Sequence, residues 1–314
     1  MPTTLDVLSA YERISPLVRE TPVERAHLAE PVWLKLEHLQ HTGSFKFRGA
    51  CNKIALLTPE QAAAGVITAS NGNHGLGVAA AARARGVAAE VFVSAHVAPA
   101  KAQRIEAFGA RLHRAGEDPL TAELAARRAA EQSGRVFISP YNDLDVAAGQ
   151  GTIAVELLRQ LPALDAIFVA VGGGGLIAGI GSYLKSVSPR TEVVGCWPAN
   201  SPVMLRCMEA GRIVDVPEES TLSESTAGGL EPECVTLEPC REVIDRSVLV
   251  SEDEILDAMR LLMDSEHWLV EGAAGVALAA FQKEAARYRG KCAAVLLCGR
   301  NLSPEVLSRL RSHR

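Results

Sequence analysis

One lysine, Lys46, has a position in the sequence that suggests a reactive amine. Lys46 lies in residues 42–49, which read Thr-Gly-Ser-Phe-Lys-Phe-Arg-Gly, and Ser44 is a suitable N-cap for the helix predicted to follow. A charged lysine in the first turn of a helix is unfavourable, because the N-terminal end of the helix dipole is positive. A lysine held as an imine is less unfavourable there. An isolated lysine is usually a solvated surface residue, so this motif needs support from others.

Two further segments suit the binding of an anion. Residues 70–75 read Ser-Asn-Gly-Asn-His-Gly between a predicted strand and a predicted helix, and the backbone N–H groups of such a turn can face a carboxylate or a phosphate. Residues 172–175 are four successive glycines, also between a strand and a helix. They let the backbone approach a ligand closely. The first segment also fits an ordinary turn, whereas a purely structural role for four glycines is less expected.

The glycine segment also matches the dinucleotide-binding fingerprint through Gly173, Gly175 and Ala178. That fingerprint requires an acidic residue about 20 positions later. The corresponding residues 197–200 read Trp-Pro-Ala-Asn and contain none. We therefore expect a phosphate monoester rather than a pyrophosphate. A catalytically silent ligand-binding or dinucleotide-binding protein is the alternative from another functional class, and both Lys46 and the missing acid argue against it.

A fourth motif ends the last predicted strand at Cys298, which Gly299 follows. A neutral thiol at the carboxyl edge of a sheet could pair with the nitrogen of a heterocycle. Taken alone, the residue is better explained as a buried structural cysteine. The chain has seven cysteines and no Cys-x-x-Cys pair, which predicts reduced thiols rather than disulfides or a zinc site.

The elements that position these motifs alternate between short β-branched segments and longer Ala- and Leu-rich segments. This alternation predicts an α/β fold with parallel sheets flanked by helices, in which ligands bind beyond the carboxyl ends of the strands. A long ordered loop is expected at 217–239. The predicted strands are 32–36, 65–69, 90–94, 136–139, 166–171, 192–197 and 293–298. The predicted helices are 5–14, 46–57, 75–85, 99–108, 120–133, 147–160, 175–187, 201–210, 252–266, 272–287 and 304–312.

The composition excludes several classes of partner. The chain is 48% hydrophobic and 22% charged, with a net charge of −5 and no basic tract, so a nucleic-acid partner is not expected. No apolar run approaches the roughly 20 residues of a membrane helix. The N-terminus lacks the basic and apolar regions of a signal peptide. We therefore expect a cytoplasmic protein without a membrane partner.

The motifs Thr-Gly-Ser-Phe-Lys, Gly-Asn-His-Gly and Gly-Gly-Gly-Gly, in this order, resemble the fold-type II pyridoxal-phosphate enzymes. The similarity is to the serine/threonine dehydratase (ammonia-lyase) and serine racemase branch, and it covers nearly the whole chain. It implies a two-domain, tryptophan synthase β-like fold with the cofactor, pyridoxal 5′-phosphate, between the domains. Residues 1–53 and 145–314 would form the large domain that binds the cofactor, and residues 54–144 the small one. It also implies a homodimer.

The resemblance implies a role for each matching residue. Lys46 would form the Schiff base with the cofactor and then act as the base that removes the α-proton of the substrate. The other residues implied to contact the cofactor are Phe45, Asn73 at the phenolic oxygen, Gly172, Gly173, Gly174, Gly175 and Leu176 at the phosphate, and Cys298 at the pyridine nitrogen. Those implied to bind the substrate are Ser70, Asn71, Gly72 and His74.

These roles predict a β-elimination. A neutral thiol does not stabilise a protonated pyridine ring as an aspartate does, which favours rapid loss of a β-substituent over transamination. The predicted substrate is a β-hydroxy L-amino acid such as threonine or serine, and the products are a 2-oxo acid and ammonia. The alternatives are a lyase for a bulkier substrate, such as phenylserine or hydroxyaspartate, and an amino-acid racemase.

Two positions depart from the pattern of this branch. Relatives that bind a divalent cation have a glutamate and an aspartate near residues 224–229; Glu224 fits the first, but Gly228 replaces the second, so no metal is expected. In the racemases a serine directly precedes Gly-Asn-His-Gly, where this chain has Asn71. An amide has no titratable proton near neutral pH to return to Cα. Elimination is therefore expected to exceed racemisation, and Ser70 could compete only if the turn were shifted.

Overall fold

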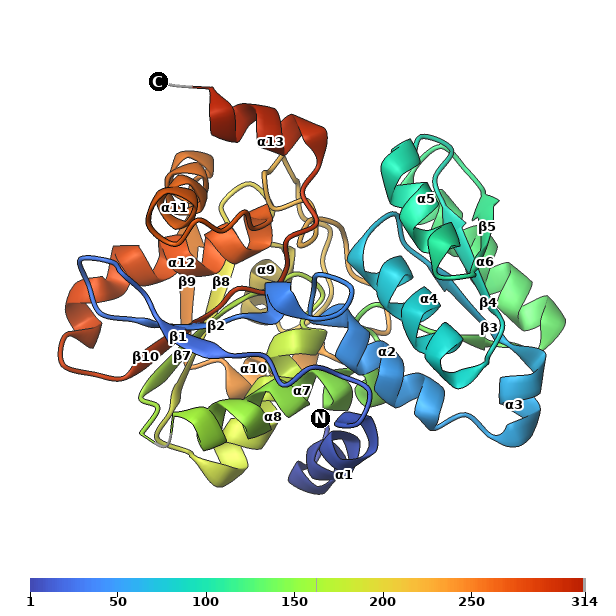
Figure 1. Cartoon of the computed structure of the whole chain (residues 1–314), viewed down its shortest axis with the longest axis horizontal. Helices are drawn as coiled ribbons and strands as arrows, with labels where there is room; N and C mark the ends of the chain where they lie inside the picture. Colours follow the sequence, from blue (N-terminus) through green and yellow to red (C-terminus); the bar gives the residue numbers. More distant parts are fainter. Residues whose placement is uncertain (162, 313–314) are drawn as a thin grey trace.

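The computed structural model describes residues 1–161 and 163–312 and has two β-sheets with helices packed around them (Figure 1). One sheet has six strands in the order β1-β2-β10-β7-β8-β9, and the other has four in the order β5-β4-β3-β6. All neighbouring strands are parallel except β1 and β2. The predicted α/β class is therefore confirmed. Pro162, His313 and Arg314, which belong to the predicted large domain, lie outside the described residues.

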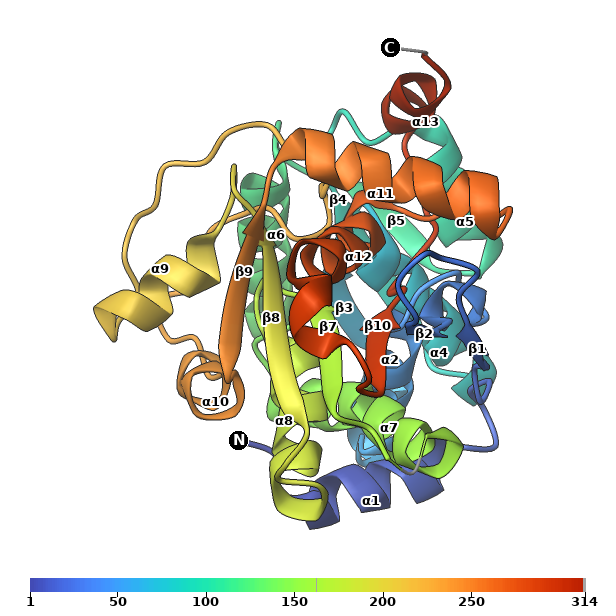
Figure 2. The ribbon, with the colours of Figure 1, turned by 90° about the vertical axis from the view of Figure 1, so that its left-hand side faces the viewer.

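The six-stranded sheet has a fully buried centre. Every residue of β7 and β10 is buried, because helices cover both faces, and such strands read as continuous apolar runs. Figure 1 shows α11 and α12 on one face and α1, α7 and α8 on the other, and Figure 2 shows β8 and β9 side by side at one edge. The strands are β1 (Val23–Arg25), β2 (Trp33–Lys35), β7 (Ala166–Ala170), β8 (Glu192–Pro198), β9 (Arg246–Val250) and β10 (Ala293–Leu296). The helices on its two faces are α1 (Thr4–Ile14), α7 (Leu144–Gln160), α8 (Gly175–Val187), α11 (Glu252–Ser265) and α12 (Gly272–Glu284).

The four-stranded sheet lies entirely within residues 54–144. Its strands are β3 (Val66–Ala69), β4 (Ala89–Val93), β5 (Arg111–Arg114) and β6 (Val136–Phe137). Its helices are α3 (Pro59–Ala64), α4 (Asn73–Arg85), α5 (Pro99–Ala107) and α6 (Pro119–Ser133). Helix α2 (Lys46–Ala55) packs against both α4 and α7, and it thereby joins the two halves of the structure (Figure 1). The remaining elements are η1 (Glu37–Leu39), α9 (Val203–Ala210), α10 (Leu237–Val243), η2 (Ala285–Tyr288) and α13 (Pro304–Arg311).

Each predicted strand and helix has a counterpart, and the predicted helix 175–187 matches α8 at both ends, but η1 and five further elements were not predicted. Three of these five, β1, β5 and β9, are edge strands, which bury less and so carry a weaker apolar pattern. The other two are the short helices α3 and α10. The predicted loop 217–239 is wrong at its end, because α10 begins at Leu237. Pro239 lies in the first turn of that helix, where a missing N–H is tolerated.

The predicted N-cap of α2 is also wrong. Phe45 occupies the cap position, with a helical backbone and no side-chain cap. Ser44 instead forms an antiparallel β-bridge with Gly299, which ties the start of α2 to the segment after β10. This long-range pairing overrides the local preference of serine for a cap. Among the described residues, none of the helices combines the length and the apolar character needed to cross a membrane.

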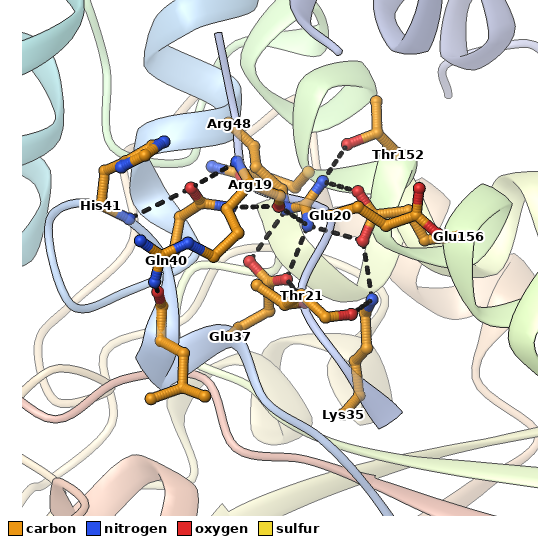
Figure 3. Close-up of polar contacts among 12 residues, drawn as sticks. Arg19, Glu20, Thr21, Lys35, Glu37, Gln40, His41, Arg48, Thr152 and Glu156 are labelled. Atoms are coloured by element: carbon orange, nitrogen blue, oxygen red, sulfur yellow. Dashed lines mark hydrogen bonds and ion pairs between the residues drawn. The ribbon is translucent and has the colours of Figure 1, made fainter. Parts of the chain in front are cut away.

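Four buried charged side chains fasten α2 to its neighbours (Figure 3). Arg48 donates to both oxygens of Glu37, at 2.7 and 2.8 Å, and to both oxygens of Glu156, at 2.6 and 2.8 Å. Lys35 donates to Glu156 at 2.6 Å and to the carbonyl oxygen of Thr21 at 2.7 Å. Burial alone would raise the pKa of Glu37, but the charge of Arg48 and its hydrogen bonds hold that pKa below its ordinary value. Two positive and two negative charges thus balance inside the protein.

Replacement of Arg48 by methionine should destabilise the fold strongly. It leaves Glu37 and Glu156 buried without their shared donor, which costs about 3–5 kcal/mol. Chemical denaturation followed by circular dichroism measures the loss. The control is Arg241→Met, which removes an exposed ion pair with Glu238 and should cost less than about 1 kcal/mol. Equal unfolding midpoints for the two variants would contradict the role given to Arg48.

Candidate active site

A cavity of about 520 Å³ lies at the carboxyl ends of strands from both sheets. Its wall includes segments that follow β3, β6, β7 and β10 in the chain, the place where ligands bind in open α/β sheets. A smaller cavity of about 50 Å³ adjoins it, and Lys46, Asn73 and Tyr141 line both. The two cavities together form the candidate active site.

Lys46 is the first residue of α2 and faces both cavities. Its Nζ donates a hydrogen bond of 2.7 Å to the carbonyl oxygen of Pro140. Burial lowers the pKa of Lys46 to about 8, and the nearby Cys298 and Glu271 oppose this shift. An amine with a lowered pKa has a larger neutral fraction near pH 7, so it can act as a nucleophile and as a base. The lysine at the helix start is therefore a reactive group rather than a solvated surface charge.

The glycine segment between β7 and α8 forms a wall of bare backbone around the smaller cavity. A Cβ at Gly173 would lie 2.2 Å from the Tyr141 ring, and one at Gly174 would lie 2.5 Å from Cys240 Sγ. Gly174 also has a φ of +83°, which other residues rarely adopt. The N-terminus of α8 opens onto this wall, so its free N–H groups can bind an anion. The cradle therefore suits a phosphate group.

Side chains of the turn at 70–74 form hydrogen bonds within the turn and to the end of β4, which the sequence does not predict. The amide of Asn71 donates to Ser94 Oγ at 2.8 Å and accepts from Ser94 N at 2.9 Å, so it braces the end of β3 against the end of β4. Ser70 Oγ accepts a hydrogen bond of 3.1 Å from the N–H of Gly72. The backbone of the turn, together with the N-terminus of α4, is left to face the larger cavity.

His74 is buried behind this turn and is neutral. Its Nε2–H donates to the carbonyl oxygen of Ile138 at 3.0 Å. Burial, followed by the charge of Lys46, lowers the pKa of His74 to about 3. The side chain therefore brings no positive charge to a bound carboxylate, and any attraction for an anion must come from N–H groups.

Glu271 is a site residue that the sequence analysis missed. It is buried in the wall of the larger cavity, and the described residues give it no ion pair. Its carboxylate accepts from Asn73 Nδ2 at 2.9 Å and from Ser225 Oγ at 3.1 Å, and burial raises its pKa. Asn301 donates to Asn73 Oδ1 at 2.5 Å, so the Asn73 amide is held from both sides. An acidic residue directly after an apolar segment, at the start of a helix, was the available signal.

The structure brings all of the predicted site residues together around the two cavities. Cys298 lies in the smaller cavity, where burial raises the pKa of its thiol well above the ordinary value and keeps it neutral. The predicted residues that line the larger cavity are Lys46, Ser70, Asn71, Gly72, Asn73, His74 and Gly173. Those that line the smaller one are Phe45, Lys46, Asn73, Gly172, Gly173, Gly174, Gly175, Leu176 and Cys298.

The positions considered for a metal are engaged in other contacts. Glu224 accepts from Ser303 Oγ at 2.7 Å and lies 3.4 Å from Lys101 Nζ. The N–H of Gly228 donates to Glu218 at 2.9 Å. Within residues 1–161 and 163–312, no group of three or more His, Cys, Asp or Glu side chains is placed to hold a metal ion.

Comparison with known proteins identifies the family of the chain. Residues 8–299 match the family described as pyridoxal-phosphate dependent enzyme. L-threonine ammonia-lyase of Thermotoga maritima is 36% identical over 99% of this chain and 78% of its own length. Serine racemase of Arabidopsis thaliana is 32% identical over 92% of this chain and 88% of its own. The solved structure of maize serine racemase superimposes with a TM-score of 0.91 at 28% identity, over 98% of this chain and 96% of that one.

These matches confirm the resemblance that the motifs carry and the predicted cofactor. In the structure, the buried lysine, the glycine cradle and the neutral thiol surround one pair of cavities. The chain therefore belongs to the pyridoxal-phosphate dependent enzyme family.

Proposed function

We propose that this protein is an ammonia-lyase that converts a β-hydroxy L-amino acid, such as threonine or serine, into a 2-oxo acid and ammonia. The observation that carries the proposal is Lys46, a lysine whose pKa burial lowers to about 8 between an anion-binding turn and a glycine cradle. The relatives named L-threonine ammonia-lyase and L-threonine dehydratase support the same reaction.

The residues of the smaller cavity and of the adjoining part of the larger one would hold pyridoxal phosphate. Gly172 to Gly175 and Leu176 would bind its phosphate at the start of α8, Phe45 would pack beside the ring, and Cys298 would face its pyridine nitrogen. Asn73 would donate to its phenolic oxygen from the position that Glu271 and Asn301 fix. The bound cofactor supplies the electron sink that makes the α-proton of the substrate acidic. The protein positions the cofactor and sets the electrostatic environment around it.

The larger cavity would bind and orient the substrate. Backbone N–H groups of the turn formed by Ser70, Asn71, Gly72 and His74 would hold its carboxylate. This places Cα near Lys46, which would hold the cofactor covalently and then take up the α-proton at Nζ. The pKa of about 8 suits this second task, because a general base works best when its pKa lies near the working pH.

A serine racemase is the second candidate, and the relatives with that name favour it. Racemisation needs an acid–base group on the face of the cofactor opposite Lys46. Asn71 has no proton that titrates near neutral pH, and Ser94 holds its amide in place. The hydroxyl of Ser70 accepts from Gly72 within the turn itself. These contacts support elimination as the main reaction.

The remaining expectations belong to the same proposal. Each sheet falls within one predicted domain, which supports a large domain of residues 1–53 and 145–314 and a small one of 54–144. The resemblance to the family supports a homodimer, and the composition supports a cytoplasmic location. Because Gly228 carries no ligand side chain, we propose that the reaction needs no divalent cation.

Replacement of Gly174 by aspartate should weaken cofactor binding by about tenfold or more, because the side chain meets Cys240 and its charge repels the phosphate. Absorbance of the bound cofactor at known protein concentration measures the effect. The control is Gly134→Asp, which imposes a similar left-handed backbone in open space far from the cradle. Normal cofactor occupancy in the Gly174 variant would refute the cradle.

Replacement of Lys46 by alanine should remove the visible absorption band of the covalently held cofactor. It should also lower the rate of 2-oxo acid formation by about 10⁴-fold or more, because it removes both the covalent attachment and the base. Lys101, which lines the same cavity, provides the matched control. Lys101→Ala should keep both the band and a measurable rate. A Lys46 variant that retained both would show that another residue holds the cofactor.

With L-serine as substrate, D-serine should form about 10²-fold more slowly than pyruvate, since Asn71, where the racemases have a serine, offers no titratable proton. Chiral chromatography of the reaction mixture, combined with a pyruvate assay, gives the two rates. The D-serine rate in a sample without enzyme is the baseline. Comparable rates of D-serine and pyruvate formation would instead support the racemase.

A further inference from the structure

Part of the wall of the larger cavity is apolar and has no role in binding the cofactor or the substrate carboxylate. Its residues are Pro119, Leu120, Leu222, Leu302 and Val306. Leu120 is 67% exposed, although it is a large hydrophobic side chain. One exposed leucine needs no explanation, but five apolar side chains among the polar residues of one cavity offer surface that a ligand can cover.

The topology places Leu120 on the same side of the structure as the carboxylate-binding turn. It is the second residue of α6, which begins after the carboxyl end of β5. The turn at 70–74 follows the carboxyl end of β3 in the same parallel sheet, and α6 packs against β3. A substrate held at that turn would therefore have Leu120 within the same cavity.

The charges around the cavity argue against a second carboxylate on the substrate. Its acidic residues are Glu123, Glu224 and Glu271. Of the cationic side chains that line it, Lys46 serves the chemistry and Lys101 lies 3.4 Å from Glu224. An acidic β-substituent would meet repulsion without a free cation to offset it.

The larger cavity has a volume of about 520 Å³, which the cofactor and the substrate would share, because the smaller cavity of about 50 Å³ cannot hold the whole cofactor. The apolar part of the wall is therefore what bears on the size of the substituent. Small side chains such as those of serine and threonine would leave the apolar wall in contact with water. A larger apolar substituent would cover it, and burial of apolar surface is favourable.

We propose that the preferred substrate carries a neutral, apolar β-substituent larger than a methyl group, such as a phenyl ring, and that Leu120 is a specificity-determining residue. This inference rests on the proposed β-elimination. For phenylserine, the α-proton passes to Lys46 and the β-hydroxyl leaves Cβ as water after taking up a proton. Hydrolysis then consumes one water and releases phenylpyruvate and ammonia.

The test compares kcat/KM of the holoenzyme for L-threonine, L-serine, L-threo-phenylserine and L-threo-3-hydroxyaspartate, read out by 2-oxo acid formation. Phenylserine should exceed threonine by about tenfold or more, the size of effect that one or two well-packed carbon groups produce. Hydroxyaspartate should be the poorest of the four. A kcat/KM for hydroxyaspartate above that for threonine would overturn the inference. So would a kcat/KM for threonine above that for phenylserine.

A matched pair of variants tests Leu120 itself. Leu120→Arg should lower the ratio of kcat/KM for phenylserine over threonine by about tenfold and raise the ratio for hydroxyaspartate over threonine. Leu124 lies one turn further along α6, is 47% exposed and does not line the cavity, so Leu124→Arg should leave both ratios unchanged. Equal changes in the two variants would show that Leu120 does not contact the substrate.

The outcomes separate this inference from the proposed function. Turnover of serine and threonine without a preference for phenylserine refutes the inference and leaves the lyase in place. If none of the four substrates is turned over, the proposed function fails. Titration of the visible band of the bound cofactor then still compares phenylserine with threonine, and tighter binding of threonine would refute the apolar pocket independently of catalysis.

Discussion

The contact of Arg48 with two buried carboxylates is the interaction on which the site depends. Arg48 lies two residues after Lys46 on α2, and its partners come from η1 and α7 (Figure 3). Apolar packing alone would allow the helix to slide or rotate by small amounts. A guanidinium that binds carboxylates through paired hydrogen bonds fixes both distance and direction. The first turn of α2, and the lysine on it, is thereby held in one position.

The second constraint is the meeting of segments from both sheets. Asn73 begins α4 beside the four-stranded sheet, whereas Glu271 and Asn301 belong to the part of the chain that flanks β10. These three side chains form one hydrogen-bonded group across the gap between the sheets. The orientation of the Asn73 amide therefore depends on how the two halves are placed, which α2 determines by packing on α4 and α7. The geometry of the site is therefore set together with the arrangement of the two sheets.

Local signals made part of this structure predictable. The strands at the sheet centre are apolar throughout because they are buried on both faces, and the glycines at 172–175 stand where side chains would collide. Long-range contacts decided the rest. Ser44 has the residue type of a cap but pairs with Gly299, and Asn71 is bound by Ser94, 23 residues away. Glu271 meets Asn73 across 198 residues, a contact that no periodicity of the sequence reveals.

The same burial that positions Lys46 also prepares it to react. A folded-state pKa of about 8, below that of a free lysine, means that the unfolded chain binds more protons at Nζ between these two values. Stability therefore rises with pH through that window, and below about pH 8 the protonated lysine opposes folding. The helix dipole acts in the same direction, because its positive end faces the amine. Arg48, two residues away, is in contrast paired with Glu37 and Glu156. The paired charge of Arg48 thus stabilises the start of α2, where, among the described residues, the amine of Lys46 stays unpaired.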